Sequence, residues 1–316
     1  MTCSVAVDLG GTNIALGIVS ENAELLYKTS VPVADGENVE ALLHQIAEEV
    51  SRTIADSGVE PSSVSFVGIG VPGICQSEKG PVLFAPNIHW KAVDLVGILE
   101  KELNLPVLVG NDADCALLGE YRAGTAKDYD RVLMLTLGTG VGGSFLSGGK
   151  FSPGFGPHGG EFGHIPLVHN GVLCGCGKRG CFEAYCSAVA LKRETREAAA
   201  LHPESLLWTL CDGDLQKIGG RMPFDAAAQG DETAKAVVDQ YIRYLADGIS
   251  GLVNLFRPDV VLLGGGVSNQ GADLFDPLDA EVQKLCYASF AVEPPHVLRA
   301  ALGNKAGILG AGLLGF

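Results

Sequence analysis

A glycine pair divides the run Val5-Ala6-Val7-Asp8-Leu9-Gly10-Gly11-Thr12-Asn13-Ile14-Ala15-Leu16-Gly17-Ile18 into two halves. In each half, large apolar residues occupy every second position, which is typical of a β-strand with one face in the core. Two such strands joined by glycines predict a β-hairpin whose backbone N–H groups are not shielded by a Cβ. A second run of this form, Val132–Leu146, turns at Gly138-Thr139-Gly140. We interpret the pair as a weak internal duplication, with one hairpin in each of two related domains.

Outside the hairpins, strand patterns alternate with helix patterns. Two helices are indicated by apolar residues at helical spacing behind a capping residue, Asn38 for the first and Asp231 for the second. Further buried strands are expected at Val64–Ile69, Pro106–Val109 and Val260–Leu263. The alternation predicts an α/β fold, and 316 residues fit about two domains of ~150 residues each.

The overall composition restricts the classes of partner. A formal net charge of −15 argues against nucleic acid or an anionic membrane as the main partner. The sequence contains no signal-peptide pattern and no run of 18 apolar residues, so we expect a cytoplasmic protein without membrane contact. Nine cysteines, an odd number in a long chain, argue against a disulfide framework. Six are scattered and are expected to be core thiols: Cys3, Cys75, Cys115, Cys186, Cys211 and Cys286.

Three glycine turns follow predicted strands: Gly10-Gly11-Thr12, Gly138-Thr139-Gly140 and Gly264-Gly265-Gly266. Backbone N–H groups at such turns can bind phosphate, because no Cβ obstructs the approach. Asp8, at the end of the first strand, could hold Mg²⁺ through water, since this ion prefers carboxylate and phosphate oxygens. Taken alone, the first of these is better explained as an ordinary hairpin turn, and the third equally well as a glycine packing site. The three together favour a bound nucleotide such as ATP.

A histidine and three cysteines form the most specific motif. His164 precedes the run Cys174-Gly175-Cys176-Gly177-Lys178-Arg179-Gly180-Cys181. Three thiolates and one imidazole complete the tetrahedral shell of Zn²⁺, and the glycines allow a tight knuckle; redox-active cysteines are the alternative. Because four protein ligands leave no open position, the ion is expected to be structural.

Acidic residues beside these motifs are candidates for proton transfer and sugar binding. Asp112 follows a strand and begins a helix, where a carboxylate could accept the proton of a substrate hydroxyl, as in kinases. A helix cap is the alternative for Asp112 and for Asp114. Glu161 and Glu183 bracket the zinc segment and could bind vicinal hydroxyl groups of a sugar. Solvated surface charges are the alternative for these two glutamates.

Together these motifs resemble the ROK family of sugar kinases over essentially the whole chain. The most specific part is Glu161-Phe162-Gly163-His164, followed ten residues after the histidine by Cys-x-Cys-Gly-x-x-Gly-Cys-x-Glu, which ends at Glu183. The resemblance implies an actin/hexokinase-like ATPase fold, with two α/β domains around a central cleft and a zinc knuckle. We expect a smaller domain at residues 1–115 plus 300–316 and a larger one at 116–299. Repressors of this family carry a winged helix-turn-helix before the first glycine motif. Because only seven residues precede Asp8, we do not expect such a repressor.

The resemblance also implies a role for each matching residue. Asp112 would bind the sugar and remove the proton from its 6-hydroxyl, and His164 would give one ring nitrogen to zinc and the other to the sugar. The other hydroxyl-binding residues would be Asn87, Asn111, Glu161 and Glu183. The phosphates of ATP would lie against Asp8, Gly10, Gly11, Thr12, Gly138, Thr139 and Gly140, and the adenosine against Gly264, Gly265 and Gly266.

The sequence therefore predicts an ATP-dependent hexokinase that uses Mg²⁺ and carries structural Zn²⁺, with glucose as the acceptor. A kinase for fructose, mannose, allose or an N-acetylhexosamine remains open, because the same recognition residues recur across these specificities. Segment Lys150–Gly160 is expected to shape the pocket at the sugar 2-position. Polyphosphate is an alternative donor, and a non-catalytic sugar sensor is the alternative from another class. The family resemblance implies a homodimer or a tetramer.

Overall fold

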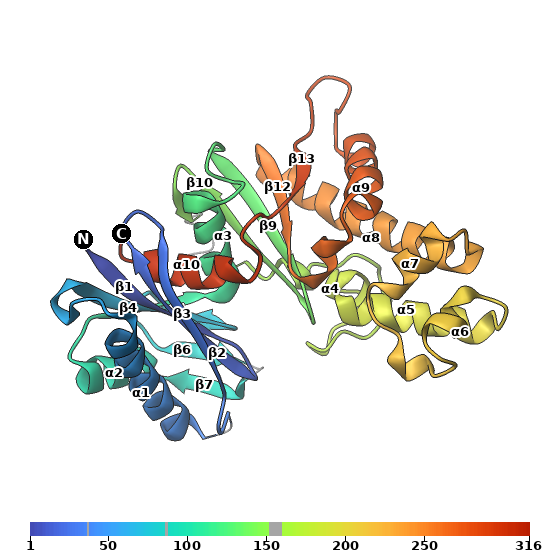
Figure 1. Ribbon diagram of the computed structural model, residues 1–316. Helices are drawn as coiled ribbons and strands as arrows, with labels where there is room; N and C mark the ends of the chain where they lie inside the picture. Colours follow the sequence, from blue (N-terminus) through green and yellow to red (C-terminus); the bar gives the residue numbers. More distant parts are fainter. Residues whose placement is uncertain (37, 86–87, 152–159) are drawn as a thin grey trace. The chain divides into compact units, whose positions relative to one another are not determined.

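The computed structural model describes residues 1–36, 38–85, 88–151 and 160–316 (Figure 1). It contains two compact units. Unit 1 consists of Met1–Asp130, Ser144–Gly160 and Ala301–Phe316, and unit 2 consists of Arg131–Gly143 and Glu161–Ala300. Both chain termini therefore belong to unit 1. In the described part of the chain, no helix combines the length and the apolar character needed to cross a bilayer.

The sheet of unit 1 grows from the first hairpin. Its strand order is β3-β2-β1-β4-β8, with the first three strands antiparallel and β4 and β8 parallel to β1. Its strands are β1 (Cys3–Leu9), β2 (Asn13–Ser20), β3 (Leu25–Pro32), β4 (Val64–Val71) and β8 (Val107–Asn111). A smaller antiparallel sheet contains β5 (Ile74–Cys75), β6 (Val82–Ala85) and β7 (Trp90–Val93). The strands predicted from the alternating pattern are confirmed.

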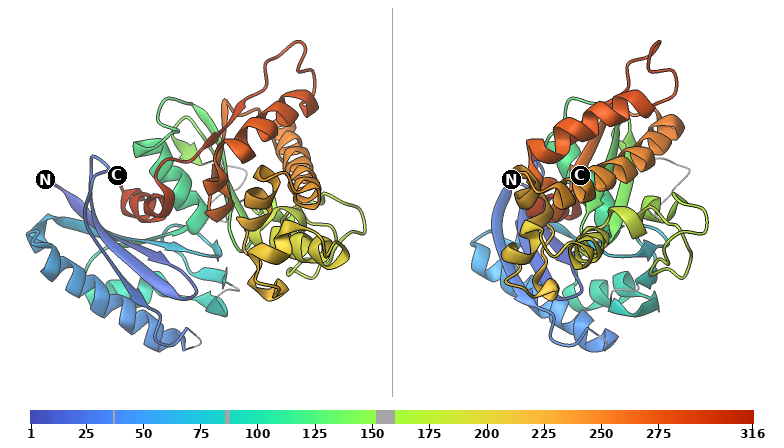
Figure 2. Two further views of the ribbon diagram at one scale, coloured as in Figure 1. Left: turned by 45° about the vertical axis from the view of Figure 1, so that its right-hand side comes forward. Right: turned by 90° about the vertical axis from the view of Figure 1, so that its right-hand side faces the viewer.

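Helices cover both faces of the larger sheet, because successive side chains of a strand point to opposite faces. Val5 and Val7 of β1 share a core with α1 (Val39–Ser57) and α2 (Leu95–Leu103). The intervening Ala6 packs with α3 (Asp112–Ala123) and α10 (Ala306–Leu313). These two helices lie on the face of the sheet opposite α1 and α2 (Figures 1 and 2).

Helices α3 and α10 approach each other unusually closely. A Cβ on Gly310 would lie 1.6 Å from the Cys115 carbonyl oxygen, and one on Gly119 would lie 2.4 Å from that of Ala306. Because either Cβ would overlap backbone atoms, glycine is required at both positions. Both helices belong to unit 1, whose first segment extends to Asp130.

The sheet of unit 2 repeats the plan of the first. Its order is β11-β10-β9-β12-β13, so a hairpin and a third strand are again followed by two strands parallel to the first. Its strands are β9 (Arg131–Leu137), β10 (Val141–Ser147), β11 (Lys150–Phe151), β12 (Val260–Gly264) and β13 (His296–Arg299). The repeated order agrees with the internal duplication interpreted from the two hairpins. Strand β10 crosses from unit 2 to unit 1 between Gly143 and Ser144.

The helices of unit 2 are α4 (Glu183–Cys186), α5 (Ala188–Leu201), α6 (Leu206–Leu210), α7 (Met222–Ala228), α8 (Glu232–Phe256) and α9 (Ala272–Leu285). Asp231 caps α8 by accepting the N–H of Ala234 at 2.7 Å, as predicted. Short 3-10 helices lie at Pro61–Ser63, Phe162–His164, Leu215–Lys217, Gly266–Gln270 and Gly303–Lys305. The six scattered cysteines are all buried thiols, which confirms their predicted place in the core.

Candidate functional site

The predicted site residues fall into two groups. Unit 1 contains Asp8, Gly10, Gly11, Thr12, Asn111 and Asp112, and unit 2 contains the second and third glycine turns, the histidine–cysteine cluster, Glu161 and Glu183. Asn87 and most of the predicted specificity segment, residues 152–159, lie outside the described residues.

In unit 1, the parallel strand register brings Asp8 and Asp112 to the same sheet edge. Asp8 pairs with Gly70 of β4, and Gly70 pairs with Gly110 of β8. One residue beyond Gly110, Asn111 caps helix α3 by accepting the N–H groups of Ala113 and Asp114. Asn111 is therefore the cap residue, and Asp112 Oδ1 accepts one N–H group at the helix start, that of Ala113 at 2.9 Å. The capping alternative for Asp112 is therefore not the arrangement observed.

The surroundings of Asp112 suit a proton acceptor. Restricted solvation raises the pKa of its carboxyl group to about 7, with the negative charge of Asp8 as the second cause. The residue nevertheless remains exposed to solvent. Burial raises the pKa of Asp8 as well. A carboxyl group with a pKa near 7 can remove a proton and release it again near neutral pH.

Asp114 does not cap helix α3; its side chain bonds to Ser144 instead. It is 8% exposed, and its Oδ1 accepts the hydroxyl proton of Ser144, which is 2% exposed, at 2.5 Å. Burial raises the pKa of Asp114 to about 6, while the Ser144 hydrogen bond lowers it. Sequence reasoning missed this pair because the two residues are far apart in the chain. An acidic residue on the buried side of a helix was the one available signal.

The first glycine turn is a tight hairpin turn in which Gly10 N–H donates to the Asn13 carbonyl at 2.9 Å. A Cβ on Gly10 would lie 3.1 Å from that same oxygen. The structure places Gly11 and Thr12 exposed at the tip. Their exposure leaves the tip accessible to a ligand.

In unit 2, His164, Cys174, Cys176 and Cys181 converge. Their ligand atoms all lie within 4.8 Å of one another. The Cys176 and Cys181 sulfurs are 3.6 Å apart, and the Cys174 sulfur is 3.7 Å from His164 Nδ1. A tetrahedral ion with Zn–S bonds of about 2.3 Å separates its ligands by roughly 3.8 Å. The donor set and its spacing therefore fit zinc.

The backbone of the knuckle depends on glycine. Gly180 has a φ of +81°, and a Cβ there would lie 1.7 Å from the Val168 carbonyl oxygen. Burial raises the pKa of the Cys174 thiol to about 12, whereas a Lys178 N–H lowers that of the exposed Cys176. A bound cation favours the thiolate form of both, as zinc sites require.

Glu161, His164 and Glu183 lie around this cluster. His164 directs Nδ1 towards the Cys174 sulfur, while its Nε2 lies 4.0 Å from a Glu161 carboxylate oxygen. The two ring nitrogens therefore face different groups, as the predicted dual role requires. Glu183 begins α4, and its Oε1 lies 3.4 Å from the Cys174 sulfur.

Glu183 also joins the knuckle to the second glycine turn. Its Oε2 accepts the N–H of Val141 at 3.0 Å, directly after the turn. A Cβ on Gly140 would lie 2.4 Å from that oxygen, whereas a Cβ on Gly138 would meet nothing within 4 Å. Gly140 therefore makes room for Glu183, while Gly138 borders open space.

The third glycine turn lies beside the second. Gly264 pairs with Thr136 across the parallel strands β12 and β9. The next residue, Gly265, has a φ of +81°, and a Cβ there would lie 2.5 Å from the Leu137 carbonyl oxygen. This close packing brings the candidate phosphate and adenosine segments of unit 2 to one sheet edge.

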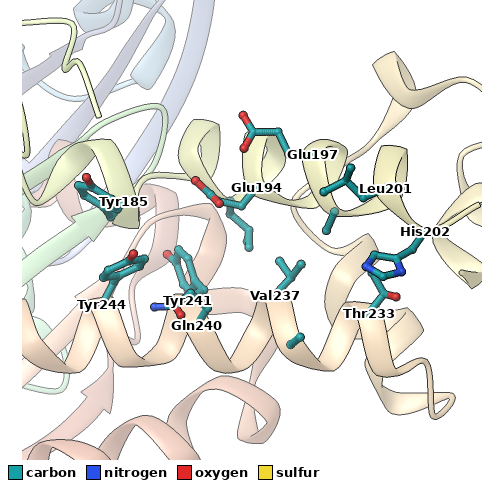
Figure 3. Close-up of a pocket in the computed structure, with 13 residues that line it drawn as sticks. Tyr185, Glu194, Glu197, Leu201, His202, Thr233, Val237, Gln240, Tyr241 and Tyr244 are labelled. Atoms are coloured by element: carbon teal, nitrogen blue, oxygen red, sulfur yellow. The ribbon is translucent and has the colours of Figure 1, made fainter. Parts of the chain in front are cut away.

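A separate groove of about 420 Å³ lies between α5 and α8 (Figure 3). Tyr185, Tyr241 and Tyr244 line one end, and Leu201 and His202 line the other. The Tyr185 hydroxyl oxygen accepts the N–H of Val172 at 2.7 Å, a hydrogen bond within unit 2. None of the predicted site residues lines this groove, so it is not the candidate site.

Comparison with known proteins gives a consistent result. The sequence model described as "ROK family" matches residues 4–315. The chain is 38% identical to a glucokinase from Thermotoga maritima, over 97% of this chain and 95% of the relative.

Solved structures agree. A ROK family glucokinase from Streptomyces griseus in complex with glucose and AMPPNP has a TM-score of 0.83 at 37% identity, covering 98% of each chain. A ROK hexokinase from Thermus thermophilus has a TM-score of 0.82 at 34% identity, covering 99% of this chain and 97% of the other.

Proposed function

Because this chain belongs to the ROK family, we propose that it transfers the terminal phosphoryl group of ATP to the 6-hydroxyl of glucose. Its similarity to glucokinases extends over nearly the full length of both chains. AMPPNP is an analogue of ATP, so the complex of the Streptomyces griseus relative supports ATP as the donor. The observation in this structure that carries the proposal is the Asp112 carboxyl group, whose pKa is raised to about 7 near Asp8.

In this proposal Asp112 accepts the proton of the 6-hydroxyl as that oxygen attacks the γ-phosphorus. The bond from the γ-phosphorus to the β–γ bridging oxygen breaks, and ADP leaves. Asn111, Glu161, His164 and Glu183, together with Asn87, bind the other sugar hydroxyls. Closure of two domains over a central cleft excludes water, so that the sugar hydroxyl is the acceptor.

The glycine turns bind the nucleotide. Gly10, Gly11, Thr12, Gly138, Thr139 and Gly140 offer backbone and hydroxyl donors to the phosphates, and Gly264, Gly265 and Gly266 contact the adenosine. The open space at Gly138 and the exposed tip at Thr12 support these assignments. Mg²⁺, when bound, neutralises charge on the phosphates, and Asp8 is the carboxylate placed to hold it through water.

Zinc has a structural role in the proposal. His164, Cys174, Cys176 and Cys181 hold the ion, whose four bonds fix the knuckle. Glu161 and Glu183 are then fixed at its two ends, where they can bind a sugar. The close approach of His164 and Glu183 to Cys174 supports this coupling of metal and sugar sites.

The remaining expectations stay predictions. They are the domain division at 1–115 plus 300–316 and 116–299, the cytoplasmic location, and the homodimer or tetramer. A kinase for another hexose remains the alternative, and the assay used for glucose tests it as well.

The deciding experiment measures ADP release with ATP and a panel of glucose, fructose, mannose, allose and N-acetylhexosamines. We expect the highest kcat/KM with glucose, and loss of turnover in Asp112→Asn. Polyphosphate replaces ATP in a parallel series, to identify the donor. Glucose binding without ADP release, measured by calorimetry on the same sample, would instead identify a sugar sensor.

A further inference from the structure

Where the chain passes between the two units, consecutive residues are bonded to different units. One passage lies between Ala300 and Ala301. Ala300 N–H donates to the Leu263 carbonyl of β12, in unit 2, at 2.9 Å. Ala301 N–H donates to Glu120 Oε2 of α3, in unit 1, at 3.1 Å. Two consecutive residues are thus hydrogen-bonded to different units.

The passage at Asp130 and Arg131 has the same form. The Asp130 carbonyl accepts the N–H of Gly148, in unit 1, at 3.0 Å. Arg131 N–H donates to Asp259 Oδ2, in unit 2, at 2.9 Å. A rotation between the units would have to bend the chain between these two residues.

The passage at Gly143 and Ser144 differs, because both residues lie in strand β10. A Cβ on Gly143 would lie 2.5 Å from the Phe162 ring, so this residue is packed tightly within unit 2. Ser144 instead donates its hydroxyl to Asp114 of α3, in unit 1. Ser144 also stays in β10, which pairs with β9 of unit 2, so among these three passages the anchors change within one peptide only at 130–131 and 300–301.

Glu120 is central to the unit 1 anchors. Its side chain is 0% exposed, and no ion pair involves it in the part of the chain that the structure describes. Its carboxylate instead accepts three backbone N–H groups, from Thr125 at 2.9 Å, Ala301 at 3.1 Å and Leu302 at 2.7 Å. These bonds join the segment that leaves α3 to the segment that returns from unit 2. A Cβ on Gly124 would lie 2.0 Å from Glu120 Oε2, so glycine is needed beside the carboxylate.

Helix α3 therefore carries the candidate base and two of the unit 1 anchors. Asp112 lies in its first turn, Asp114 follows two residues later, and Glu120 lies in its last turns. A buried carboxylate that accepts several N–H groups is held in one geometry, because any displacement leaves charge and donors unsatisfied.

We propose that Glu120 is a positioning residue for phosphoryl transfer. With Asp114, it fixes the returning chain to the helix that carries Asp112. The hinge then bends at 130–131 and 300–301, and α3 moves as part of unit 1. The proposal rests on the proposed kinase function, since positioning is measured through turnover.

The first test is Glu120→Gln, which keeps the size of the side chain but removes acceptor capacity. Hydrogen exchange, measured without substrates, should show at least tenfold faster exchange at the amides of Thr125, Ala301 and Leu302, with β1 and β4 unchanged. The kcat with glucose should fall about tenfold, while the glucose KM stays within threefold. We expect kcat to fall without a matching rise in KM, because glucose would still bind but fewer of the bound complexes would close in the productive orientation.

Arg122→Gln is the matched control on the same helix. Arg122 is exposed, and it donates to the Phe316 and Glu21 carbonyls rather than to a passage between units. Its kcat and exchange pattern should match those of the unchanged protein. Faster exchange at the three amides in Glu120→Gln, with kcat within twofold, would overturn the proposal. Faster exchange throughout unit 1 with unchanged kcat per folded molecule would do the same.

A second variant keeps the proposal testable if Glu120→Gln does not fold. Ser144→Ala removes only the hydroxyl that Asp114 accepts, and Ser147→Ala on the same strand is its control. Ser144→Ala should lower kcat at least threefold without raising the glucose KM, and equal kcat in the two variants would overturn the proposal. If the unchanged protein phosphorylates no hexose, the proposed function fails. The exchange result, obtained without substrate, then still decides whether Glu120 anchors the passages.

Discussion

Gly140→Ala provides a sharp test of how the second glycine turn and the knuckle cooperate. The new Cβ would lie 2.4 Å from Glu183 Oε2, whereas ordinary contacts begin at 3.4 Å. Glu183 must therefore retreat by about 1 Å, since the backbone of the turn is held by hydrogen bonds from Ala188 and within the hairpin. We expect this variant to fold and to bind glucose poorly.

The expected size of the effect follows from the hydrogen bonds of Glu183. Its bond to Val141 N–H, 3.0 Å long, would lengthen to about 4 Å and cease to be a hydrogen bond. The carboxylate would also lose its bond to the sugar. A hydrogen bond to a charged group contributes about 1.5–3 kcal/mol, and ~1.36 kcal/mol corresponds to tenfold in affinity. The glucose KM should therefore rise roughly 10- to 150-fold.

The assay is steady-state ADP release, with glucose and ATP varied separately and the melting temperature measured on the same samples. Gly138→Ala is the matched control, because its Cβ meets nothing within 4 Å of protein. It should raise the KM for ATP, whose phosphate would occupy that space, and leave the glucose KM within threefold. An unchanged glucose KM in Gly140→Ala would refute the placement of Glu183 in the sugar site.

Three further predictions concern the base and the metal. Asp112→Asn should lower kcat by about 10²- to 10⁴-fold with a glucose KM within threefold, and near-normal turnover in this variant would contradict its role as base. Because the pKa of Asp112 is raised to about 7, its carboxyl group is protonated and inactive at lower pH. A pH profile of kcat/KM should therefore rise towards a plateau above about 7, and Asp8→Asn should shift its midpoint to lower pH, since the Asp8 charge helps to raise that pKa. Metal analysis should find one zinc per chain, and removing it with a chelator should raise the glucose KM at least tenfold; a metal-free protein with an unchanged KM would refute the structural role of zinc.

The sequence predicted local structure well, because local structure depends on neighbours in the chain. Alternating apolar residues identified β1 and β2, and capping residues identified the starts of α1 and α8. The cysteine ligands were predictable for the same reason. Cys174, Cys176 and Cys181 belong to one short loop, whose glycines allow it to close on itself.

Contacts between residues far apart in the chain could not be predicted in this way, because they depend on how the strands pair. The register of β1, β4 and β8 decides that Asp8 lies near Asp112, and the charge of Asp8 contributes to the raised pKa of Asp112. No periodicity in the sequence records which strand ends share an edge, since every buried strand presents the same alternating or apolar pattern.

By itself, the sequence determined the α/β elements, the glycine turns, the histidine and cysteines of the candidate zinc site, and the family to which the chain belongs. Only the tertiary structure decided that Glu183 bonds to Val141, that Asp114 holds Ser144, and that Glu120 binds Ala301. The physical reason is that these carboxylates, buried in Asp114 and Glu120 and half-buried in Glu183, bond to partners brought near by packing. The sequence does not distinguish such an acidic residue from a solvated one, because only the fold excludes water from its carboxylate and provides hydrogen-bond donors.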